Sequence, residues 1–200
     1  MVAELVEGAD GRTRCGWVRA DADYIAYHDA EWGTPLHGDR ALFEKISLEG
    51  FQAGLSWITI LRRRPGFRDA FDGFDLETVA GYDERDVERL MGDERIIRNR
   101  QKIDATIGNA RLTLDLVRDD PGALDRLMWS FAPTTTRPRP VVWADIPAVT
   151  PESEALSVAL RKLGFRFVGP TTMYALMQSA GMVDDHLTGC WRAAAVPGAS

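Results

Sequence analysis

Four side chains near the two ends of the chain constrain its fold more than any other feature. Cys15 and His28 stand near the start, and His186 and Cys190 stand near the end. They include both cysteines of the chain and two of its three histidines. Thiolate and neutral imidazole are preferred ligands of zinc, and His186 and Cys190 are spaced to share one face of a helix or a tight turn. The pattern predicts a Cys2His2 zinc site that joins the two ends of the chain.

The predicted metal site is structural, because four protein ligands fill a tetrahedral shell and leave no position for a bound water. The alternative is two buried free cysteines and two hydrogen-bonded histidines, since widely split pairs are a weaker signal than clustered fingers. A disulfide is a third arrangement, but residues 1–14 carry acids where a signal peptide would carry a basic region and an apolar stretch. We therefore expect a cytoplasmic protein with reduced cysteines.

The length and composition favour one globular domain over residues 1–200, or one domain with two lobes. No apolar run approaches the roughly 18 residues that cross a bilayer, so we expect no membrane association. Asp39, Asp83 and Thr150 can each cap a helix, and a further helical period runs over residues 96–114. The sequence thus predicts an all-α protein with an irregular connection over 132–151, a short strand at 141–143, and loose tails at 1–11 and 193–200.

Basic residues are clustered although the net charge is −6. Each cluster alone is typical of a solvated helix end, but three clusters on one face would attract phosphates. The three clusters comprise Arg62, Arg63, Arg64 and Arg68; Arg95, Arg98, Arg100 and Lys102; and Arg161, Lys162 and Arg166.

Glu49 lies in the middle of an apolar helical stripe with Leu42, Ile46 and Ala53. A carboxylate that faces inward is costly unless it is paired or binds a ligand, so the position suggests the floor of a pocket. The alternative is that the helix breaks near Gly50 and Gly54 and that Glu49 caps it or faces solvent. Rings near this acid in the sequence would suit a flat, cationic or amino-bearing ligand, although aromatic residues also build cores. These rings are Tyr24, Tyr27, Trp32, Phe43, Phe51 and Trp57.

The segment 163–172 (LGFRFVGPTT) is similar to a helix-hairpin-helix. Gly164 can end a helix in the left-handed conformation, and Gly169 leaves room for a close neighbour. Pro170 at the first helical position leaves the amides of Thr171 and Thr172 free for a phosphate, which implies binding of DNA without sequence preference. An ordinary antiparallel helix pair with a Gly-bounded loop is the alternative.

Several long, aromatic-rich strings closely resemble the bacterial 3-methyladenine DNA glycosylase I family. They are RCGW (14–17), YIAYHDAEWG (24–33), LEGFQAGLSWITI (48–60), IIRNRQKI (96–103), GFRFVGPT (164–171) and residues 177–190. The strings occur in the family order over nearly the whole chain, so an ordered domain is expected over 12–192. The resemblance implies an all-α helix-hairpin-helix glycosylase whose termini are joined by one structural Zn²⁺, bound by Cys15, His28, His186 and Cys190.

The resemblance also assigns roles to individual residues. Glu49 would accept hydrogen bonds from the adenine edge and act in catalysis, with Tyr27 as a polar contact and Trp57 as the stacking ring. Tyr24 and Trp17 would belong to the wall of this base pocket. Residues that contact DNA would be Gly54 and Leu55, which wedge into the duplex, and Gly164, Gly169 and Thr171 of the hairpin.

The implied reaction is hydrolysis of the N-glycosidic bond of 3-methyladenine, with 3-methylguanine as a second candidate base, in alkylated double-stranded DNA after base flipping. The strings that carry the pocket contain no lysine to serve as an amine nucleophile, so a monomeric, monofunctional enzyme without strand cleavage is expected. Two rivals remain: a catalytically silent, zinc-stabilised DNA-binding module, and a binder or hydrolase of modified purine nucleosides.

Overall fold

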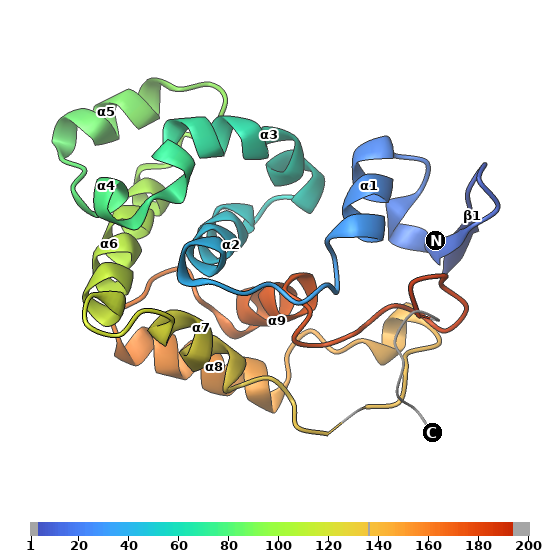
Figure 1. Ribbon diagram of the computed structural model, residues 1–200. Coiled ribbons are helices and arrows are strands. Elements are labelled where there is room, and N and C mark those ends of the chain that lie inside the picture. The colour runs from blue at the N-terminus through green and yellow to red at the C-terminus, as the bar shows by residue number, and fades with distance from the viewer. Residues whose placement is uncertain (1–3, 136, 194–200) are drawn as a thin grey trace. The chain divides into compact units, whose positions relative to one another are not determined.

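The computed structural model describes residues 4–135 and 137–193 and is mostly helical, as predicted (Figure 1). Within these residues the one sheet has two short antiparallel strands, β1 (Leu5–Glu7) and β2 (Thr13–Cys15). No helix in this part of the chain is both long enough and apolar enough to cross a membrane. The described residues form two compact units, which we call the terminal unit and the helical unit.

The terminal unit consists of the described residues of Met1–Pro35, Pro133–Ala148 and Met177–Ser200. It contains β1, β2, the 3-10 helix η1 (Gly16–Val18), helix α1 (Ala22–Ala30) and the 3-10 helix η3 (Trp143–Asp145). Segments from both ends of the chain meet here, since the Trp191 amide donates to the carbonyl of Thr13 in β2 at 2.8 Å. The two ends of the described chain are therefore joined within one unit.

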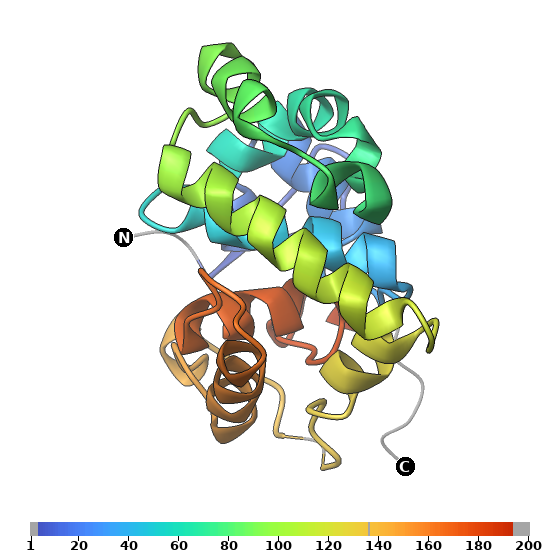
Figure 2. The same ribbon diagram turned by 90° about the vertical axis from the view of Figure 1, so that its left-hand side faces the viewer.

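The helical unit consists of Leu36–Ala132 and Val149–Leu176. Its elements are α2 (Asp39–Gln52), α3 (Trp57–Ala70), η2 (Asp72–Phe74), α4 (Leu76–Ala80), α5 (Glu84–Gly92), α6 (Arg100–Val117), α7 (Ala123–Trp129), α8 (Pro151–Lys162) and the start of α9 (Pro170–Ser179). Helix α6 is the long helix that crosses Figure 2, and it packs against α2, α4, α5 and α7. A cluster of fully buried rings fills the core beside α2 and α3: Phe43, Phe51, Phe67, Phe71 and Phe74.

Two of the three predicted helix caps are confirmed. Asp83 and Thr150 each accept backbone hydrogen bonds at the start of α5 and α8, and both helices begin with a capping box. Asp39 is instead the first residue of α2, after the N-cap Gly38. Its carboxylate accepts from the amides of Gly122 and Asp125 at the start of α7, at 2.6 and 3.0 Å. This contact with a distant segment explains why a local cap prediction was wrong there.

Three other predictions need correction. Residues 5–7, predicted as part of a loose tail, form β1 because they pair with β2 in the register Leu5↔Cys15. The strand predicted at 141–143 is absent from the described structure, and η3 begins there at Trp143 because Asp145 accepts from the amides of Val141 and Val142. Helix α6 begins at Arg100 after its N-cap Asn99, later than the predicted start at Ile96. The predicted tail beyond residue 193 lies outside the described residues.

Candidate functional site

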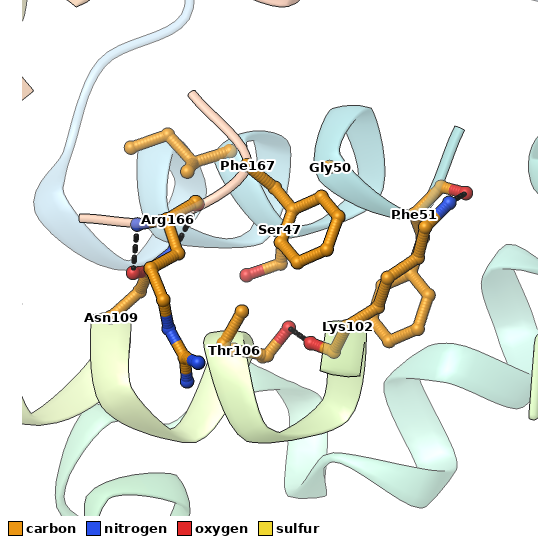
Figure 3. Close-up of a pocket in the computed structure, with 10 residues that line it drawn as sticks. Ser47, Gly50, Phe51, Lys102, Thr106, Asn109, Arg166 and Phe167 are labelled. Atoms are coloured by element: carbon orange, nitrogen blue, oxygen red, sulfur yellow. Dashed lines mark hydrogen bonds between the residues drawn. The ribbon is translucent and has the colours of Figure 1, made fainter. Parts of the chain in front are cut away.

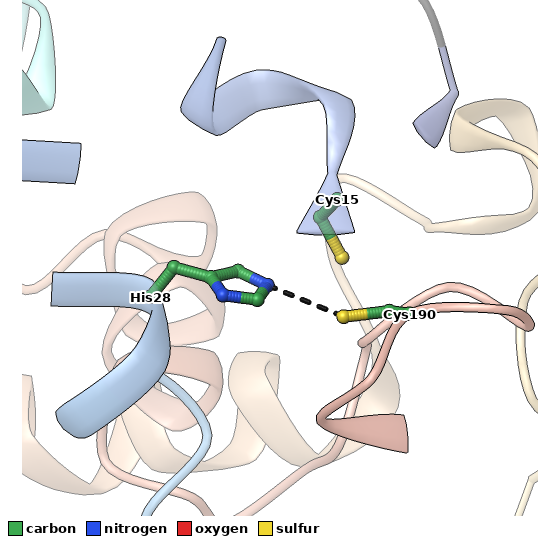
Figure 4. A group of neighbouring side chains, drawn as sticks. All are labelled: Cys15, His28 and Cys190. Atoms are coloured by element: carbon green, nitrogen blue, oxygen red, sulfur yellow. Dashed lines mark hydrogen bonds between the residues drawn. The ribbon is translucent and has the colours of Figure 1, made fainter. Parts of the chain in front are cut away.

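Three of the four predicted metal ligands come together in the terminal unit (Figure 4). Cys15 ends β2, His28 lies in the last turn of α1, and Cys190 follows the turn at 188–189. All three side chains are buried, and their ligand atoms lie within 4.8 Å of one another. The Nε2 atom of His28 is 3.4 Å from the Sγ atom of Cys190. This arrangement places two sulfurs and one imidazole nitrogen around one point.

The two thiols differ in acidity. Hydrogen bonds with Cys15 and with His28 outweigh the effect of burial and lower the pKa of Cys190. The same contact, together with burial, raises the pKa of Cys15. Cys190 is therefore the thiol that forms a thiolate first, which is the form that binds a metal.

Each predicted histidine ligand is oriented by a carboxylate through its other ring nitrogen. His28 Nδ1 lies 2.8 Å from Asp29 Oδ1, and His186 Nδ1 lies 2.8 Å from Asp184 Oδ1. Burial raises the pKa of both carboxyls, but hydrogen bonds outweigh it and bring each pKa to about 2. Because ionised carboxylates only accept hydrogen bonds, both Nδ1 atoms are donors, which leaves Nε2 of each neutral imidazole as the atom that can bind a metal.

His186 is not one of the three clustered residues, but its ring centroid lies 5.0 Å from that of His28. Its Nε2 atom is buried and makes no hydrogen bond to any described residue. A buried acceptor without a partner is costly, and a cation near it would satisfy it. The donor set of two sulfurs and two Nε2 nitrogens, each imidazole held by a carboxylate, fits a zinc ion.

Gly33 allows His186 to approach, a feature that the sequence interpretation missed. A β-carbon at Gly33 would lie 2.7 Å from Cε1 of His186, and the φ of Gly33 is +73°. Either fact alone disfavours another residue here. Gly33 ends the YIAYHDAEWG string, so its place beside Trp32 in a family motif was the available signal.

Sequence reasoning also missed the ion-pair network around Asp29. Arg14 is 3% exposed and donates to Asp29 through Nε at 2.9 Å and Nη2 at 2.6 Å. The same guanidinium donates to Asp10, and Trp191 Nε1 donates to Asp29 at 3.1 Å. Asp29 therefore connects β2, α1 and the C-terminal segment without a metal.

The residues predicted for the base pocket are divided between the two units. In the terminal unit, the Trp17 ring makes edge contacts with Tyr24 and Tyr27, at centroid distances of 5.3 and 6.4 Å. Glu49 and Trp57 belong to the helical unit. Their assembly with the three rings into one pocket stays a prediction.

Glu49 lies inside α2, which continues through Gly50 to Gln52. The helix therefore ends between Gly50 and Gly54, as the alternative expected, but Glu49 is only 3% exposed, so the alternative in which it faces solvent is wrong. Trp57 is the first residue of α3, and the ammonium of Lys45 lies 5.4 Å from its ring centroid. Lys45, one turn before Glu49 and 7% exposed, was not singled out from the sequence.

The predicted wedge residues form an exposed turn between α2 and α3. Gly54 has a φ of +82°, which explains why a glycine stands there, and Leu55 is 42% exposed. Lys102, from the first turn of α6, donates from Nζ to the carbonyls of Phe51 and Ala53 at 2.9 and 2.6 Å. An apolar side chain thus points outward from a turn whose start is held by a lysine.

The predicted hairpin occupies residues 163–169, between α8 and α9. Gly164 adopts a φ of +98°, and the amides of Gly164 and Phe165 return to the carbonyls of Arg161 and Leu160, so α8 ends as expected. Asn109 of α6 bonds both the N–H and the C=O of Arg166, at 3.0 and 3.1 Å (Figure 3). These two hydrogen bonds attach the hairpin to α6 within the helical unit.

Gly169 and Pro170 occupy the expected positions, since α9 begins at Pro170. A β-carbon at Gly169 would meet its nearest neighbour, the Arg161 guanidinium, at 3.6 Å, which is an ordinary contact. The protein itself therefore leaves room for a side chain at Gly169. Thr171 is exposed in the first turn of α9.

The basic clusters differ in how far they are neutralised. Arg68 pairs with Glu44, and Arg95 and Arg100 pair with Asp93 and Glu84. By contrast, Arg161, Lys162 and Arg166 beside the hairpin make no ion pair among the described residues. The hairpin cluster therefore keeps its positive charge available for a polyanion.

Comparison with known proteins gives consistent matches over nearly the whole chain. The family model described as methyladenine glycosylase matches residues 17–193. DNA-3-methyladenine glycosylase 1 of Escherichia coli (strain K12) is 50% identical over 180 residues, which cover 88% of this chain and 95% of that protein. DNA-3-methyladenine glycosylase of Haemophilus influenzae is 44% identical over 183 residues, which cover 89% of this chain and 96% of that protein.

Solved structures agree with these matches. A crystal structure of a 3-methyladenine DNA glycosylase I has a TM-score of 0.84 at 48% identity, covering 89% of this chain and 98% of its own. A structure of 3-methyladenine DNA glycosylase I from Staphylococcus aureus, which describes recognition of 3-methyladenine, has a TM-score of 0.82 at 32% identity. It covers 94% of this chain and 97% of its own.

Proposed function

Because the chain belongs to the methyladenine glycosylase family, we propose that it is a base-excision repair enzyme that hydrolyses the N-glycosidic bond of 3-methyladenine in alkylated double-stranded DNA. The observation that carries the proposal is the 50% identity to DNA-3-methyladenine glycosylase 1, over 95% of that relative's length. The solved relative that recognises 3-methyladenine supports the same base as substrate. The enzyme acts as a monomer.

The chemistry requires selection more than acid catalysis. Methylation at N3 gives adenine a positive charge and weakens its bond to the sugar, so the base leaves in neutral form. Flipping also costs least for a damaged base that stacks poorly. An enzyme for this reaction must bind an electron-poor, cationic purine better than a normal one, and water then attacks the sugar carbon.

Glu49 is the proposed base-selecting and catalytic residue. Its burial in α2 supports a carboxylate that faces a ligand rather than solvent. In the proposed complex it accepts hydrogen bonds from the adenine edge, Tyr27 adds a polar contact, and Trp57 stacks on the base. Tyr24 and Trp17 complete the wall of the pocket.

DNA binding is assigned to the hairpin and to the turn after α2. Free amides at the start of α9, near Thr171, would bind a phosphate without reading the base sequence. Gly164 and Gly169 bound the hairpin that precedes these amides. The unneutralised cluster of Arg161, Lys162 and Arg166 supports this assignment. Gly54 and Leu55 are proposed to fill the space that the flipped base leaves.

One structural zinc ion, bound by Cys15, His28, His186 and Cys190, is proposed for the terminal unit. A bound zinc supplies four bonds that connect β2, α1 and the C-terminal segment. The buried Nε2 of His186 and the carboxylates behind both histidines support it. With four protein ligands, the ion takes no part in the reaction.

We also propose that the enzyme is monofunctional. The Lys102 ammonium is engaged by two backbone carbonyls, which supports a structural rather than a nucleophilic lysine. Lys45 is the second buried lysine and is the one to test. Borohydride should trap no covalent complex between the enzyme and alkylated DNA, and the strand should stay intact after base release. A trapped complex that disappears in Lys45→Met would contradict this proposal.

The function is tested by chromatography of the bases released from methylated duplex DNA and from a methylated nucleoside. Free 3-methyladenine should appear from DNA and not from the nucleoside, and the same chromatogram shows whether 3-methylguanine is also released. Binding of DNA without release would favour the silent module. Release from the nucleoside, unaffected by a change at Gly169, would favour the nucleoside hydrolase.

A further inference from the structure

Lys102 is a buried cation held by backbone carbonyls rather than by an acid. It is 8% exposed, and its Nζ donates to the Phe51 carbonyl at 2.9 Å and the Ala53 carbonyl at 2.6 Å. Among the described residues it makes no ion pair with a carboxylate. Burial of an ammonium group is costly, and here it lowers the pKa of Lys102. The cost of burying this ammonium group is offset by the two backbone hydrogen bonds that it donates.

The carbonyls that Lys102 binds belong to the end of α2. The last carbonyls of a helix lack partners within the helix and carry its negative dipole end, so an ammonium there satisfies both needs. Directly after them the chain leaves the helix at Ala53, and Gly54 turns with a φ of +82°. Lys102 thus holds the first residue of the exposed turn 53–56, which carries Leu55.

The same stretch of α6 also holds the hairpin. Asn109, two turns after Lys102, bonds the backbone of Arg166, and the Phe167 ring lies 5.9 Å from the Lys102 ammonium. Gly50 of α2 approaches the hairpin closely, since a β-carbon there would lie 3.2 Å from Cβ of Phe167. Helices α2 and α6 and the hairpin therefore meet at one place (Figure 3).

The pocket at this junction is too small for a ligand. Its volume is about 10 Å³, near the minimum for one water molecule. Lys102, Thr106, Asn109 and Phe167 line it. The junction is therefore a packed support, and its polar groups serve to hold backbone.

We propose that Lys102 is a positioning residue for excision, which fixes the turn 53–56 relative to the hairpin so that Leu55 enters the duplex while the hairpin binds a phosphate. The inference rests on the proposed function for the roles of Leu55 and the hairpin. Lys102 acts through the backbone of Phe51 and Ala53 and does not contact the base. Its loss should impair unstacking of DNA and spare recognition of the free base.

The test compares Lys102→Met, which keeps the length of the side chain and removes its charge and donors, with the wild-type zinc-loaded protein. Three readouts are needed: single-turnover excision from duplex DNA, fluorescence of 2-aminopurine placed beside the methylated base, and binding of free 3-methyladenine. Lys102→Met should slow excision about tenfold or more and lose most of the fluorescence rise, whereas free-base binding should stay within about twofold.

Thr106→Val is the matched control. Thr106 lines the same pocket, and among the described residues its hydroxyl donates only to the Lys102 carbonyl within α6, at 3.0 Å. Its loss therefore disturbs the packing but not the turn. It should stay within about twofold of wild type in all three readouts. If Lys102→Met does not fold, Lys102→Gln, which keeps a neutral donor, takes its place with a smaller expected loss.

A double-variant comparison tests whether Lys102 acts through Leu55. The pair Lys102→Met with Leu55→Ala should lose no more excision than Leu55→Ala alone, because both changes remove the same wedge. Three results would each overturn the proposal. In the first, the double variant loses excision by the product of the two single-variant factors. In the second, Lys102→Met unstacks DNA like wild type, and in the third it loses free-base binding as strongly as excision. Amide hydrogen exchange at residues 54–56 should be faster in Lys102→Met than in wild type. Because this measurement does not depend on excision, it distinguishes failure of the inference from failure of the proposed function.

Discussion

At the scale of single residues, charged side chains mark both the candidate sites and the structural supports. Asp29 and Asp184 are ionised carboxylates, and each contacts the Nδ1 atom of one predicted histidine ligand. Glu49 is buried in a helix where the apolar period predicted it. The ligand spacing and the helical period are local properties, so the sequence pattern indicated the cluster of Cys15, His28 and Cys190 and the burial of Glu49, but it did not indicate Asp29 or Asp184. Arg14 and Lys102 could not be found this way, since their partners lie in distant segments.

Asp29→Asn should weaken zinc binding about 10- to 100-fold, because the amide no longer polarises His28 or holds its tautomer. The measurement is competition with a chromogenic chelator on purified protein. Asp10→Asn is the control: Asp10 also pairs with Arg14 but does not contact His28, and it is largely exposed. Equal zinc affinities for wild type and Asp29→Asn would show that the carboxylate plays no part in ligand orientation.

Trp57→Ala should weaken binding of free 3-methyladenine by about 1 to 3 kcal/mol, which is the usual contribution of one stacked base. The zinc content should not change, because Trp57 lies at the start of α3 in the helical unit and the predicted metal ligands lie in the terminal unit. Isothermal titration with the free base gives the affinity. Unchanged affinity in the folded variant would place the stacking ring elsewhere.

At the scale of elements, local signals predicted some helix ends and missed others. Asp83 and Thr150 cap their own helices, so their short sequence motifs were sufficient. Asp39 bonds the amides of α7 instead, and β1 exists because it pairs with β2. Contacts of this kind depend on the tertiary structure, which the local pattern does not contain.

Gly169→Val should weaken binding to methylated and undamaged DNA alike, because a side chain would block a phosphate at the start of α9. Stability should change little, since the nearest atom to an added β-carbon is 3.6 Å away. Free 3-methyladenine should still bind. Gly92→Val, at the end of α5 where an added β-carbon meets no atom within 4 Å, is the matched control. Parallel loss of free-base binding in Gly169→Val would mean that the fold had collapsed.

At the scale of the whole molecule, the described residues near both ends form one unit together with those of 133–148, and the remaining residues form another. The paired spacing of Cys15 with His28 and of His186 with Cys190 predicted that the ends meet, and the Asp29 network connects segments from both ends. The family matches span both units, from residue 17 to residue 193. The composition and the basic clusters alone could not predict the substrate. The substrate was predicted from the long sequence strings that resemble the glycosylase family.

Purified protein should contain about one zinc per chain, and Cys190→Ser should lower the free energy of unfolding by on the order of 3 kcal/mol before it affects excision. Metal analysis and thermal unfolding provide the measurements. Val158→Ser, an exposed substitution on α8, is the control for general surface changes. Metal-free protein with unchanged stability would contradict the structural zinc site.

The central claim is that a buried carboxylate selects a cationic purine for excision. It is tested most directly by the single-turnover rate of 3-methyladenine release from duplex DNA, with wild type and Glu49→Gln compared. The variant keeps shape and hydrogen-bonding capacity but loses the charge, so release should slow roughly tenfold to a few hundredfold, as expected for loss of a charged hydrogen bond of about 1.5 to 3 kcal/mol. DNA binding and zinc content should stay the same. Wild-type release by a correctly folded Glu49→Gln protein would contradict the claim and make Glu49 a structural acid.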